Sequence, residues 1–235
     1  MIKLEILLYI LAIAAIIFTV VAQIKVKSTF DRCSRMGTAS GKSGAEVANM
    51  ILHSQGVYNV KIERVSGSLT DHYDPRSNTL RLSDSVYGST SAAACGVAAH
   101  EAGHAIQHAV GFFPIKVRSA MVPVTTFASR FSWIAIFGGI ILTTVLESLL
   151  GYYVTLFGIG LFAVITLFEL VTLPCEFNAS SRAMAALRGS GWYSSRELSA
   201  SRSVLTAAAL TYVAALSVSL IQLLRLILRF SNRRR

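Results

Sequence analysis

Four long apolar runs alternate with two polar segments along the chain. Each run holds about 20 residues, which is enough to cross the hydrocarbon core of a bilayer as an α-helix. The first run is too long for a signal-peptide core and is expected to stay as an N-terminal anchor. The second and third runs meet around Gly151, so they are expected to form an antiparallel helical hairpin. The pattern predicts about four transmembrane helices, at residues 4–24, 131–150, 152–173 and 204–224.

Basic residues beside the apolar runs indicate how the runs are oriented. With four crossings, both long polar segments lie on one side of the membrane, and that side carries most of the nearby lysines and arginines. Because cytoplasmic loops are enriched in basic residues, we expect the polar segments in the cytoplasm. The basic C-terminal tail opposes this orientation. Either the tail is tolerated outside, or the fourth run does not fully cross.

The first polar segment has the pattern of a small α+β domain. Ser43 and Glu46 have the spacing of a capping box, and Gly56 is a suitable residue to end the helix that they begin. Two later stretches alternate in polarity as strands do, and a turn is expected at residues 74–78 between two short strands. The predicted order is a helix at 43–56, a small antiparallel sheet within 58–83, and a helix at 89–110.

Composition supports a membrane protein. The chain is 53% hydrophobic and 14% charged, with a mean hydropathy of +0.57, whereas soluble proteins carry about 25% charged residues. The net charge of +10 would suggest nucleic acid in a soluble protein, but no basic run is interleaved with aromatic residues. We therefore expect no nucleic-acid partner. The three cysteines form no C-x-x-C pair, which fits a reducing compartment.

The sequence HEAGH at residues 100–104 has the H-E-x-x-H pattern of zinc enzymes. On a helix, His100 and His104 lie on one face about 5–6 Å apart, so both imidazoles can bind one zinc ion. Glu101 lies about 100° round the helix from His100, where it can hold a water rather than the metal itself. Zinc lowers the pKa of a bound water to about 7, and the carboxylate takes its proton as it attacks a carbonyl.

His108 shares the helical face of His100 and His104 but is not expected to share their metal. At about 1.5 Å per residue, His108 lies about 12 Å from His100 along the helix axis. No break in the helix between His104 and His108 could return a third histidine to the metal, as happens in metzincins. We expect His108 to be a partner within the fold or a solvated residue.

A catalytic zinc site usually has three protein ligands and one open position, so a third ligand is needed. The positions of several acidic residues after His104 favour roles away from the metal. Glu147 lies near the far end of an apolar run, Glu169 lies within a run and can snorkel to the interface, and Glu197 forms a capping box with Ser194.

Glu176 is the candidate that position and elimination favour. It follows the third apolar run directly, on the same side of the membrane as the motif helix. Pro174 is expected to open a new helical segment there, with Glu176 in its first turn. Asp71 and His72, upstream of the motif, are the competing third ligands.

The residues around these motifs resemble a known family. The segments concerned are SGKSGAEVANMIL, GSLTDHYDPRSNTLRLSDSVY, AAHEAGHAIQH, LPCEFNASSRAM and AAALTYVAALSVSL, which span most of residues 25–220. In them the chain is similar to the neutral zinc metallopeptidases typified by the YugP-like bacterial membrane proteases. The resemblance implies a multi-pass bacterial membrane peptidase of the gluzincin type, with one zinc ion on His100, His104 and Glu176.

A more distant similarity is to the HtpX-like and CAAX prenyl membrane proteases, which share H-E-x-x-H and a downstream E-x-x-x-D. This chain has Ser180 four residues after Glu176, in place of the aspartate, with Asn178 between them. The hydrogen bonds around the metal in those proteases therefore do not carry over directly. Asn178 and Ser180 remain candidates for hydrogen bonds to the motif residues.

Analogy with gluzincins suggests how a substrate would bind. The strand that holds Leu80, Arg81 and Leu82 would be an edge strand beside the metal helix and would pair with the substrate backbone; an ordinary sheet strand is the alternative. His72 is a candidate oxyanion donor or supporting group, or else a structural turn residue. Arg182 could stabilise the oxyanion or anchor the chain at the membrane surface.

These expectations describe a mainly α membrane protein with about four transmembrane helices and a small α+β zincin-like metallopeptidase domain. The expected function is zinc-dependent hydrolysis of peptide bonds at the surface of a bacterial inner membrane, with the catalytic part on the cytoplasmic side. The expected partners are a protein or peptide substrate and the lipid bilayer. The alternatives are a site-2-type intramembrane protease, since residues 90–113 are fairly apolar, and a non-catalytic zinc-binding scaffold.

The expected organisation follows these assignments. It comprises an anchor at 1–24, a catalytic region with the H-E-x-x-H helix at 25–130, a transmembrane hairpin at 131–173, a helical segment with the third zinc ligand at 174–203, and a C-terminal transmembrane helix with a basic tail at 204–235.

Overall fold

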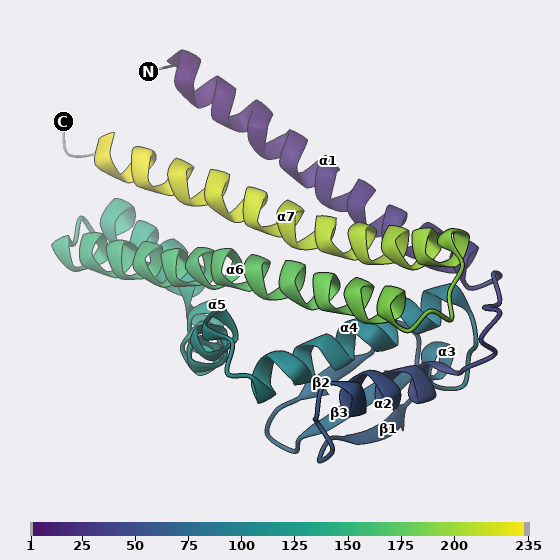
Figure 1. Cartoon of the computed structure of the whole chain (residues 1–235). Helices are drawn as coiled ribbons and strands as arrows, with labels where there is room; N and C mark the ends of the chain where they lie inside the picture. The colour runs from purple at the N-terminus through teal and green to yellow at the C-terminus, as the bar shows by residue number, and fades with distance from the viewer. Residues whose placement is uncertain (1, 233–235) are drawn as a thin grey trace. The chain divides into compact units, whose positions relative to one another are not determined.

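The computed structural model describes the backbone of residues 2–232 and the side chains of residues 5–231; the last three arginines of the predicted basic tail lie outside the described residues. Helices dominate, and three short strands form one small sheet (Figure 1). The predicted fold class is therefore confirmed. The elements are α1 (Ile2–Cys33), α2 (Gly44–Ser54), β1 (Lys61–Val65), β2 (His72–Asp74), β3 (Thr79–Ser83), α3 (Asp84–Tyr87), α4 (Ala92–Ala109), α5 (Phe113–Val145), α6 (Leu149–Gly189) and α7 (Ser195–Asn232).

The chain forms two compact units, each with its own character. The first consists of Met1–Val20, Val117–Thr172 and Tyr212–Arg235, and the second of Val21–Lys116 and Leu173–Thr211. The long helices α1, α5, α6 and α7 each contribute residues to both units.

Apolar side chains cover the outside of the first unit. Ile134, Leu149 and Phe157 each expose more than half of their surface. A helix that is apolar all round suits lipid rather than water. Among the described residues, helices α1, α5, α6 and α7 are long and apolar enough to cross a membrane, so each of the four apolar runs of the sequence lies largely within a candidate membrane-spanning helix.

The connection between α5 and α6 differs from the prediction. Helix α5 ends at Val145 and α6 begins at Leu149, with Glu147 at a φ of +49° between them. Gly151 lies inside α6, where a Cβ atom would clash with Thr143 of α5. The glycine therefore allows two helices to pack closely, and the connection lies just before it rather than at Gly151 itself.

Helix α6 also continues through Pro174, so the prediction that this proline opens a new helical segment was wrong. A proline inside a helix removes one backbone hydrogen bond and crowds the preceding turn. The other backbone hydrogen bonds of α6 keep the helix intact. Glu176 consequently lies in the interior of a long helix.

The second unit contains α2, which begins where the sequence predicts. The Ser43 hydroxyl accepts a hydrogen bond from the backbone N–H of Glu46, and the Glu46 carboxylate accepts one from the backbone N–H of Ser43 at 2.8 Å. Gly56 follows the helix at a φ of +74°, a conformation that glycine adopts readily. The capping box and the helix end are both confirmed.

The three strands form a mixed sheet in the order β1–β3–β2. β2 and β3 are the predicted hairpin and pair antiparallel, with Tyr73 opposite Leu80. β1 pairs with β3 in parallel, with Ile62 opposite Leu80. The prediction of an antiparallel sheet was wrong for β1, because alternating polarity identifies a strand but not its neighbour or direction. The one-turn helix α3 was not predicted.

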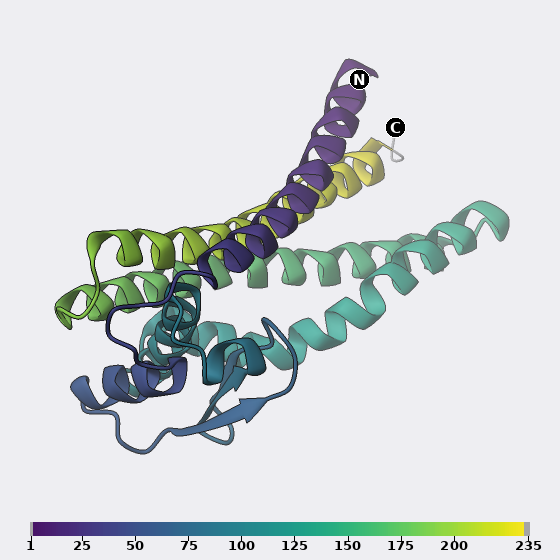
Figure 2. The same ribbon diagram turned by 90° about the vertical axis from the view of Figure 1, so that its right-hand side faces the viewer.

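The core of the second unit joins the sheet to α2 and α4. Leu80 and Leu82 point to the same face of β3, because side chains alternate along a strand, and both are fully buried. They share one apolar cluster with Val47 and Leu52 of α2 and with the alanines of α4. Figures 1 and 2 show α2 beside α4, next to the sheet.

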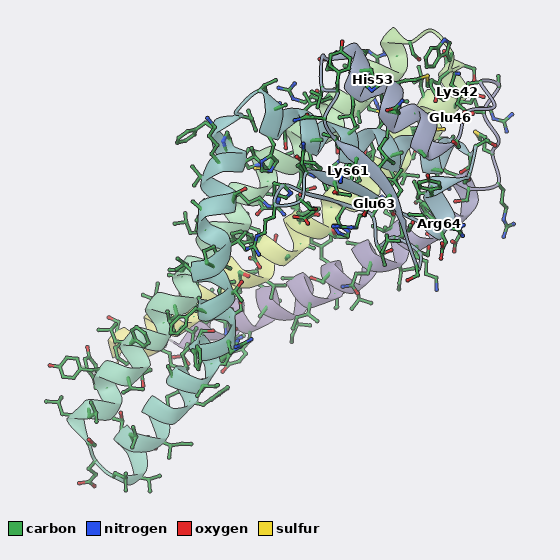
Figure 3. All side chains as sticks on the ribbon, turned by 90° about the horizontal axis from the view of Figure 1, so that it is seen from below. Lys42, Glu46, His53, Lys61, Glu63 and Arg64 are labelled. Atoms are coloured by element: carbon green, nitrogen blue, oxygen red, sulfur yellow. The ribbon has the colours of Figure 1, made fainter. Side chains whose placement is uncertain are left out.

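Charged side chains cover the outer surface of the second unit. Lys61, Glu63 and Arg64 of β1 are exposed, and Figure 3 shows them at this surface. Arg64 Nε donates to Asp84 Oδ1 at 2.6 Å in an exposed contact that stabilises little. This surface suits water, in contrast to the apolar exterior of the first unit.

Two glycines let α4 pack closely against α6 and α7 within the second unit. A Cβ atom at Gly103 would lie 2.8 Å from the carbonyl oxygen of Ala179, and one at Gly96 would lie 3.1 Å from Cβ of Ser201. The Ser201 hydroxyl also donates to the carbonyl of Ala92 at 2.7 Å. These contacts place a segment of α6 directly against the motif helix.

Candidate metal centre

His100 and His104 lie one turn apart on α4. The helix begins after Ser91, whose hydroxyl accepts a hydrogen bond from the backbone N–H of Ala94 at 3.2 Å. The two imidazole rings have their centroids 4.7 Å apart and stand nearly perpendicular, at 86°. The i, i+4 spacing therefore brings both rings to one helical face, as expected.

Glu176 of α6 joins the two histidines in a triad of possible metal ligands. Its Oε2 atom lies 3.3 Å from Nε2 of His100 and 3.6 Å from Nε2 of His104. One ligand atom from each residue lies within 4.8 Å of the others. The Glu176 side chain is 3% exposed and the His100 and His104 side chains 14% and 11%, so the triad is shielded from bulk solvent.

The donor set of the triad fits zinc. Two imidazole nitrogens and one carboxylate oxygen are a ligand set of catalytic zinc sites, which leave a fourth position for water or substrate. Both histidines turn Nε2 towards the same carboxylate oxygen, while their Nδ1 atoms face other protein groups. That arrangement leaves one nitrogen of each ring for a shared cation.

Each Nδ1 atom has a hydrogen-bonding partner. The Nδ1 atom of His100 lies 3.1 Å from the Ser180 hydroxyl oxygen. The Nδ1 atom of His104 lies 3.0 Å from Oε1 of Gln107. A metal-bound histidine normally donates its second ring N–H to such a partner, which orients the ring.

Asn178 and Arg182 extend this network. The side-chain amide of Gln107 donates to Oδ1 of Asn178 at 3.0 Å, and Arg182 Nε donates to the same oxygen at 2.8 Å. Ser180 thus contacts the motif directly, as the sequence suggested, whereas Asn178 reaches His104 only through Gln107. Gln107 was missed in the sequence. Its i+3 spacing from His104 on the predicted helix was the available signal.

Glu101 is also buried, with 9% of its surface exposed. Its charge affects His104: burial on its own would lower the pKa of His104, but the contact with the Glu176 carboxylate and the charges of Glu101 and Glu176 raise that pKa above its usual value. A carboxylate held this close to the triad can accept a proton there.

His108 lies apart from the triad. Its ring packs against Tyr73 of β2, with the ring centroids 5.4 Å apart. Of the two expectations for His108, a partner within the fold and a solvated residue, this contact favours the first.

The upstream competitors for the third ligand have other partners. Asp71 accepts hydrogen bonds from the backbone N–H of Ser83 at 2.7 Å and from its hydroxyl at 2.9 Å, and burial raises the pKa of Asp71. Exposed His72 has its Nδ1 atom 2.8 Å from the carbonyl oxygen of Thr70. Neither belongs to the triad.

The expected edge strand is in fact the central strand. β3 pairs with β1 on one side and β2 on the other, so its backbone is not free to pair with a substrate. Leu80 and Leu82 face the core, and Arg81 forms ion pairs with Glu63 at 3.4 Å and Asp74 at 3.2 Å. The prediction of an edge strand was wrong, because sequence order does not reveal spatial order within a sheet.

The other glutamates considered lie outside the triad. Glu197 accepts hydrogen bonds from the backbone N–H groups of Ser194 and Ala39, both at 2.6 Å. This confirms its structural role at the start of α7. Glu147 and Glu169 belong to the first unit.

Comparison with known proteins agrees with the resemblance carried by the sequence segments. Residues 8–231 match the family described as "Putative neutral zinc metallopeptidase". The chain is 44% identical over 224 residues to the "Putative membrane protease YugP" of Bacillus subtilis (strain 168), covering 95% of this chain and 96% of that relative. No solved structure matches the chain. Because the match spans nearly the whole sequence, including all three residues of the triad, the chain belongs to this zinc metallopeptidase family.

Proposed function

We propose that this chain is a membrane-bound, zinc-dependent peptidase that hydrolyses peptide bonds at the membrane surface. The observation that carries the proposal is the convergence of His100, His104 and Glu176 on one point. These donors are of the kind that hold catalytic zinc, and the chain belongs to a zinc metallopeptidase family. Its relative YugP, named a membrane protease, supports the same activity.

In this proposal the triad holds one zinc ion in the gluzincin arrangement of two histidines and a downstream glutamate. When bound, zinc supplies Lewis acidity, which polarises the scissile carbonyl and makes the attacking water more acidic. Glu101 takes the proton of that water as general base and then delivers it to the leaving amine. Its low exposure strengthens these electrostatic effects, because little bulk water competes.

We place the site at the cytoplasmic surface of a bacterial inner membrane that the chain crosses several times. Along α6, Glu176 comes four residues after Thr172, where the contribution of this helix to the apolar first unit ends. The basic residues of both polar segments favour the cytoplasmic side. Residues 25–130 and 174–203 then form the catalytic part, held by the anchor at 1–24, the hairpin at 131–173 and the C-terminal segment at 204–235.

The two alternatives are supported less well. A site-2-type protease needs its motif within the bilayer, but α4 is not among the candidate membrane spans found in the described part of the chain. A structural zinc site usually closes with four ligands, whereas the described residues provide a group of three.

The test combines peptidase assays with metal analysis of the full-length protein in detergent. The wild-type protein should cleave an unfolded protein substrate and hold one zinc ion per chain. Glu101→Gln keeps the size of the side chain but removes the base, so it should lose cleavage and keep zinc. His100→Ala should lose both. His53→Gln, at an exposed histidine of α2 (Figure 3), is the matched control and should change neither.

Two results would overturn this assignment. Undiminished cleavage by Glu101→Gln would exclude this glutamate as the base. A zinc-loaded wild-type protein that cleaves nothing, while the same zinc persists in His100→Ala, would mean that zinc binds elsewhere and that the triad is not its site.

A further inference from the structure

Gln107 is a fully buried polar residue directly behind His104. Its side chain has no exposed surface, and its amide makes three hydrogen bonds. The Oε1 atom lies 3.0 Å from Nδ1 of His104, and Nε2 donates to the carbonyl oxygen of Cys175 at 2.7 Å and to Oδ1 of Asn178 at 3.0 Å. A buried amide satisfied at both ends is held in one orientation.

The network itself fixes which end of the Gln107 amide faces His104. The backbone carbonyl of Cys175 can only accept a hydrogen bond, so it must receive one from the amide nitrogen. Arg182 Nε can only donate, so the Asn178 atom that it contacts is the oxygen, which needs a donor from Gln107 as well. The Gln107 oxygen is therefore left to face His104.

This orientation decides where neutral His104 carries its proton. The Gln107 oxygen only accepts, and it lies 3.0 Å from Nδ1. The Glu176 carboxylate also accepts, but it lies 3.6 Å from Nε2, beyond good hydrogen-bonding distance. The geometry favours the Nδ1–H form, which leaves the lone pair on Nε2 facing the other two members of the triad.

The same amide also connects the two helices that supply the triad. His104 and Gln107 belong to α4, whereas Cys175 and Asn178 belong to α6, on either side of Glu176. A single side chain thus holds the backbone just before Glu176 and the side chain two residues after it.

We propose that Gln107 is a positioning residue of the metal centre: it fixes His104 with Nε2 available to the metal and holds Glu176 of α6 in reach of the two histidines. This inference rests on the proposed function for the identity of the metal. It does not depend on peptide hydrolysis, because both of its consequences can be measured without a substrate.

Zinc affinity tests the first consequence. Gln107→Met keeps the length of the side chain and removes its hydrogen bonds, so zinc should bind about 10–100-fold more weakly, as when the outer partner of a metal-bound histidine is lost. Gln55→Met, the same substitution at an exposed glutamine just after α2, is the matched control and should bind zinc as the wild-type protein does. Affinity is measured on the full-length protein by competition with a chelator.

The protonation pattern of the ring tests the second consequence and separates positioning from simple loss of stability. With ¹⁵N-labelled histidine in the zinc-free protein, at a pH where the ring signals show neutral imidazole, His104 should be protonated at Nδ1. In Gln107→Met the proton should move to Nε2, towards Glu176. Gln107→Glu keeps an oxygen in front of Nδ1 but loses both hydrogen bonds to α6, so it should retain the Nδ1–H form.

The proposal is overturned if folded Gln107→Met binds zinc with wild-type affinity, or if His104 remains in the Nδ1–H form in that variant. Loss of the Nδ1–H form in Gln107→Glu would overturn the role in fixing the ring. A wild-type protein that binds zinc and shows the Nδ1–H form but cleaves no substrate would instead contradict the proposed function and leave the role of Gln107 supported.

Discussion

The Nε2 atom of His100 lies 3.3 Å from Oε2 of Glu176, although 76 residues separate the two in the sequence. Between them, residues Val117–Thr172 belong to the other compact unit. The triad therefore forms only when the part of α6 that follows this apolar segment packs against α4. Assembly of the site depends on the long helices as well as on the motif.

Glu176→Ala should weaken zinc binding more than loss of any outer hydrogen-bonding partner, by more than about 100-fold. The reason is that it removes one of three ligands and leaves two histidines from a single helix. Chelator competition on the full-length protein measures the effect. Glu147→Ala, at an exposed glutamate between α5 and α6, is the control and should bind zinc normally. Equal affinities of the two variants would exclude Glu176 as a ligand.

Much of the site could be predicted because its signals are local. The helical period alone places His100 and His104 on one face, and the length of the apolar runs leaves Glu176 just beyond the third run. The capping patterns at Ser43 and Ser194 also depend on residues within one turn, and both are present in the structure.

The features that the sequence did not reveal depend on contacts between distant segments. The place of β3 at the centre of the sheet depends on which strands become its neighbours. Glycine suits both turns and close helix packing, and only contact with the partner helix shows that Gly151 has the second role. Gln107 needs Cys175 and Asn178 of α6 before its role is visible.

Gly103→Ala should destabilise the second unit by about 1–3 kcal/mol, a typical cost of overpacking. The added methyl group would lie 2.8 Å from the carbonyl oxygen of Ala179, so α4 and α6 must separate slightly. Zinc affinity should fall in parallel, because Glu176 moves with α6. Thermal unfolding in detergent, with and without zinc, gives both values.

The control for Gly103→Ala is Gly160→Ala. Gly160 also lies within a helix, but a Cβ atom there meets nothing within 4 Å. That variant should be neutral or stabilised by up to about 1 kcal/mol. If both variants unfold at the wild-type temperature, the stability of the second unit does not depend on the close contact between α4 and α6 at Gly103.

Acidification should loosen the turn between β2 and β3. Hydrogen bonds from the Ser77 hydroxyl, the backbone N–H of Arg76 and the Arg81 guanidinium lower the pKa of Asp74 from 3.8 to about 2. Because the pKa is lowered in the folded state, the contribution of Asp74 to stability is present above about pH 3.8 and is lost as the pH falls through about 2.

Hydrogen–deuterium exchange of this turn, corrected for the intrinsic rate at each pH, measures the effect. Exchange in the wild-type protein should rise between about pH 4 and pH 2. Asp74→Asn should exchange faster already at neutral pH and show little further change. A wild-type turn that is equally protected across this range would show that Asp74 contributes nothing to it.

Zinc affinity should fall as the pH decreases, and it should begin to fall above the usual pKa of histidine. Zinc binds only the deprotonated imidazole nitrogen, and the pKa of His104 is raised above 6.5 because its contact with the Glu176 carboxylate and the charges of Glu101 and Glu176 outweigh the effect of burial. Below that raised pKa, each protonated ligand weakens apparent binding by about tenfold per pH unit.

The stability of the zinc-free protein should change with pH in the opposite sense. A raised pKa contributes stability that is fully present below the unfolded value of 6.5 and is lost as the pH rises through the folded value. Unfolding temperatures of the zinc-loaded and zinc-free protein, measured from about pH 5.5 to 8, should therefore converge towards acid. Parallel curves would show that no proton competes with zinc at His104.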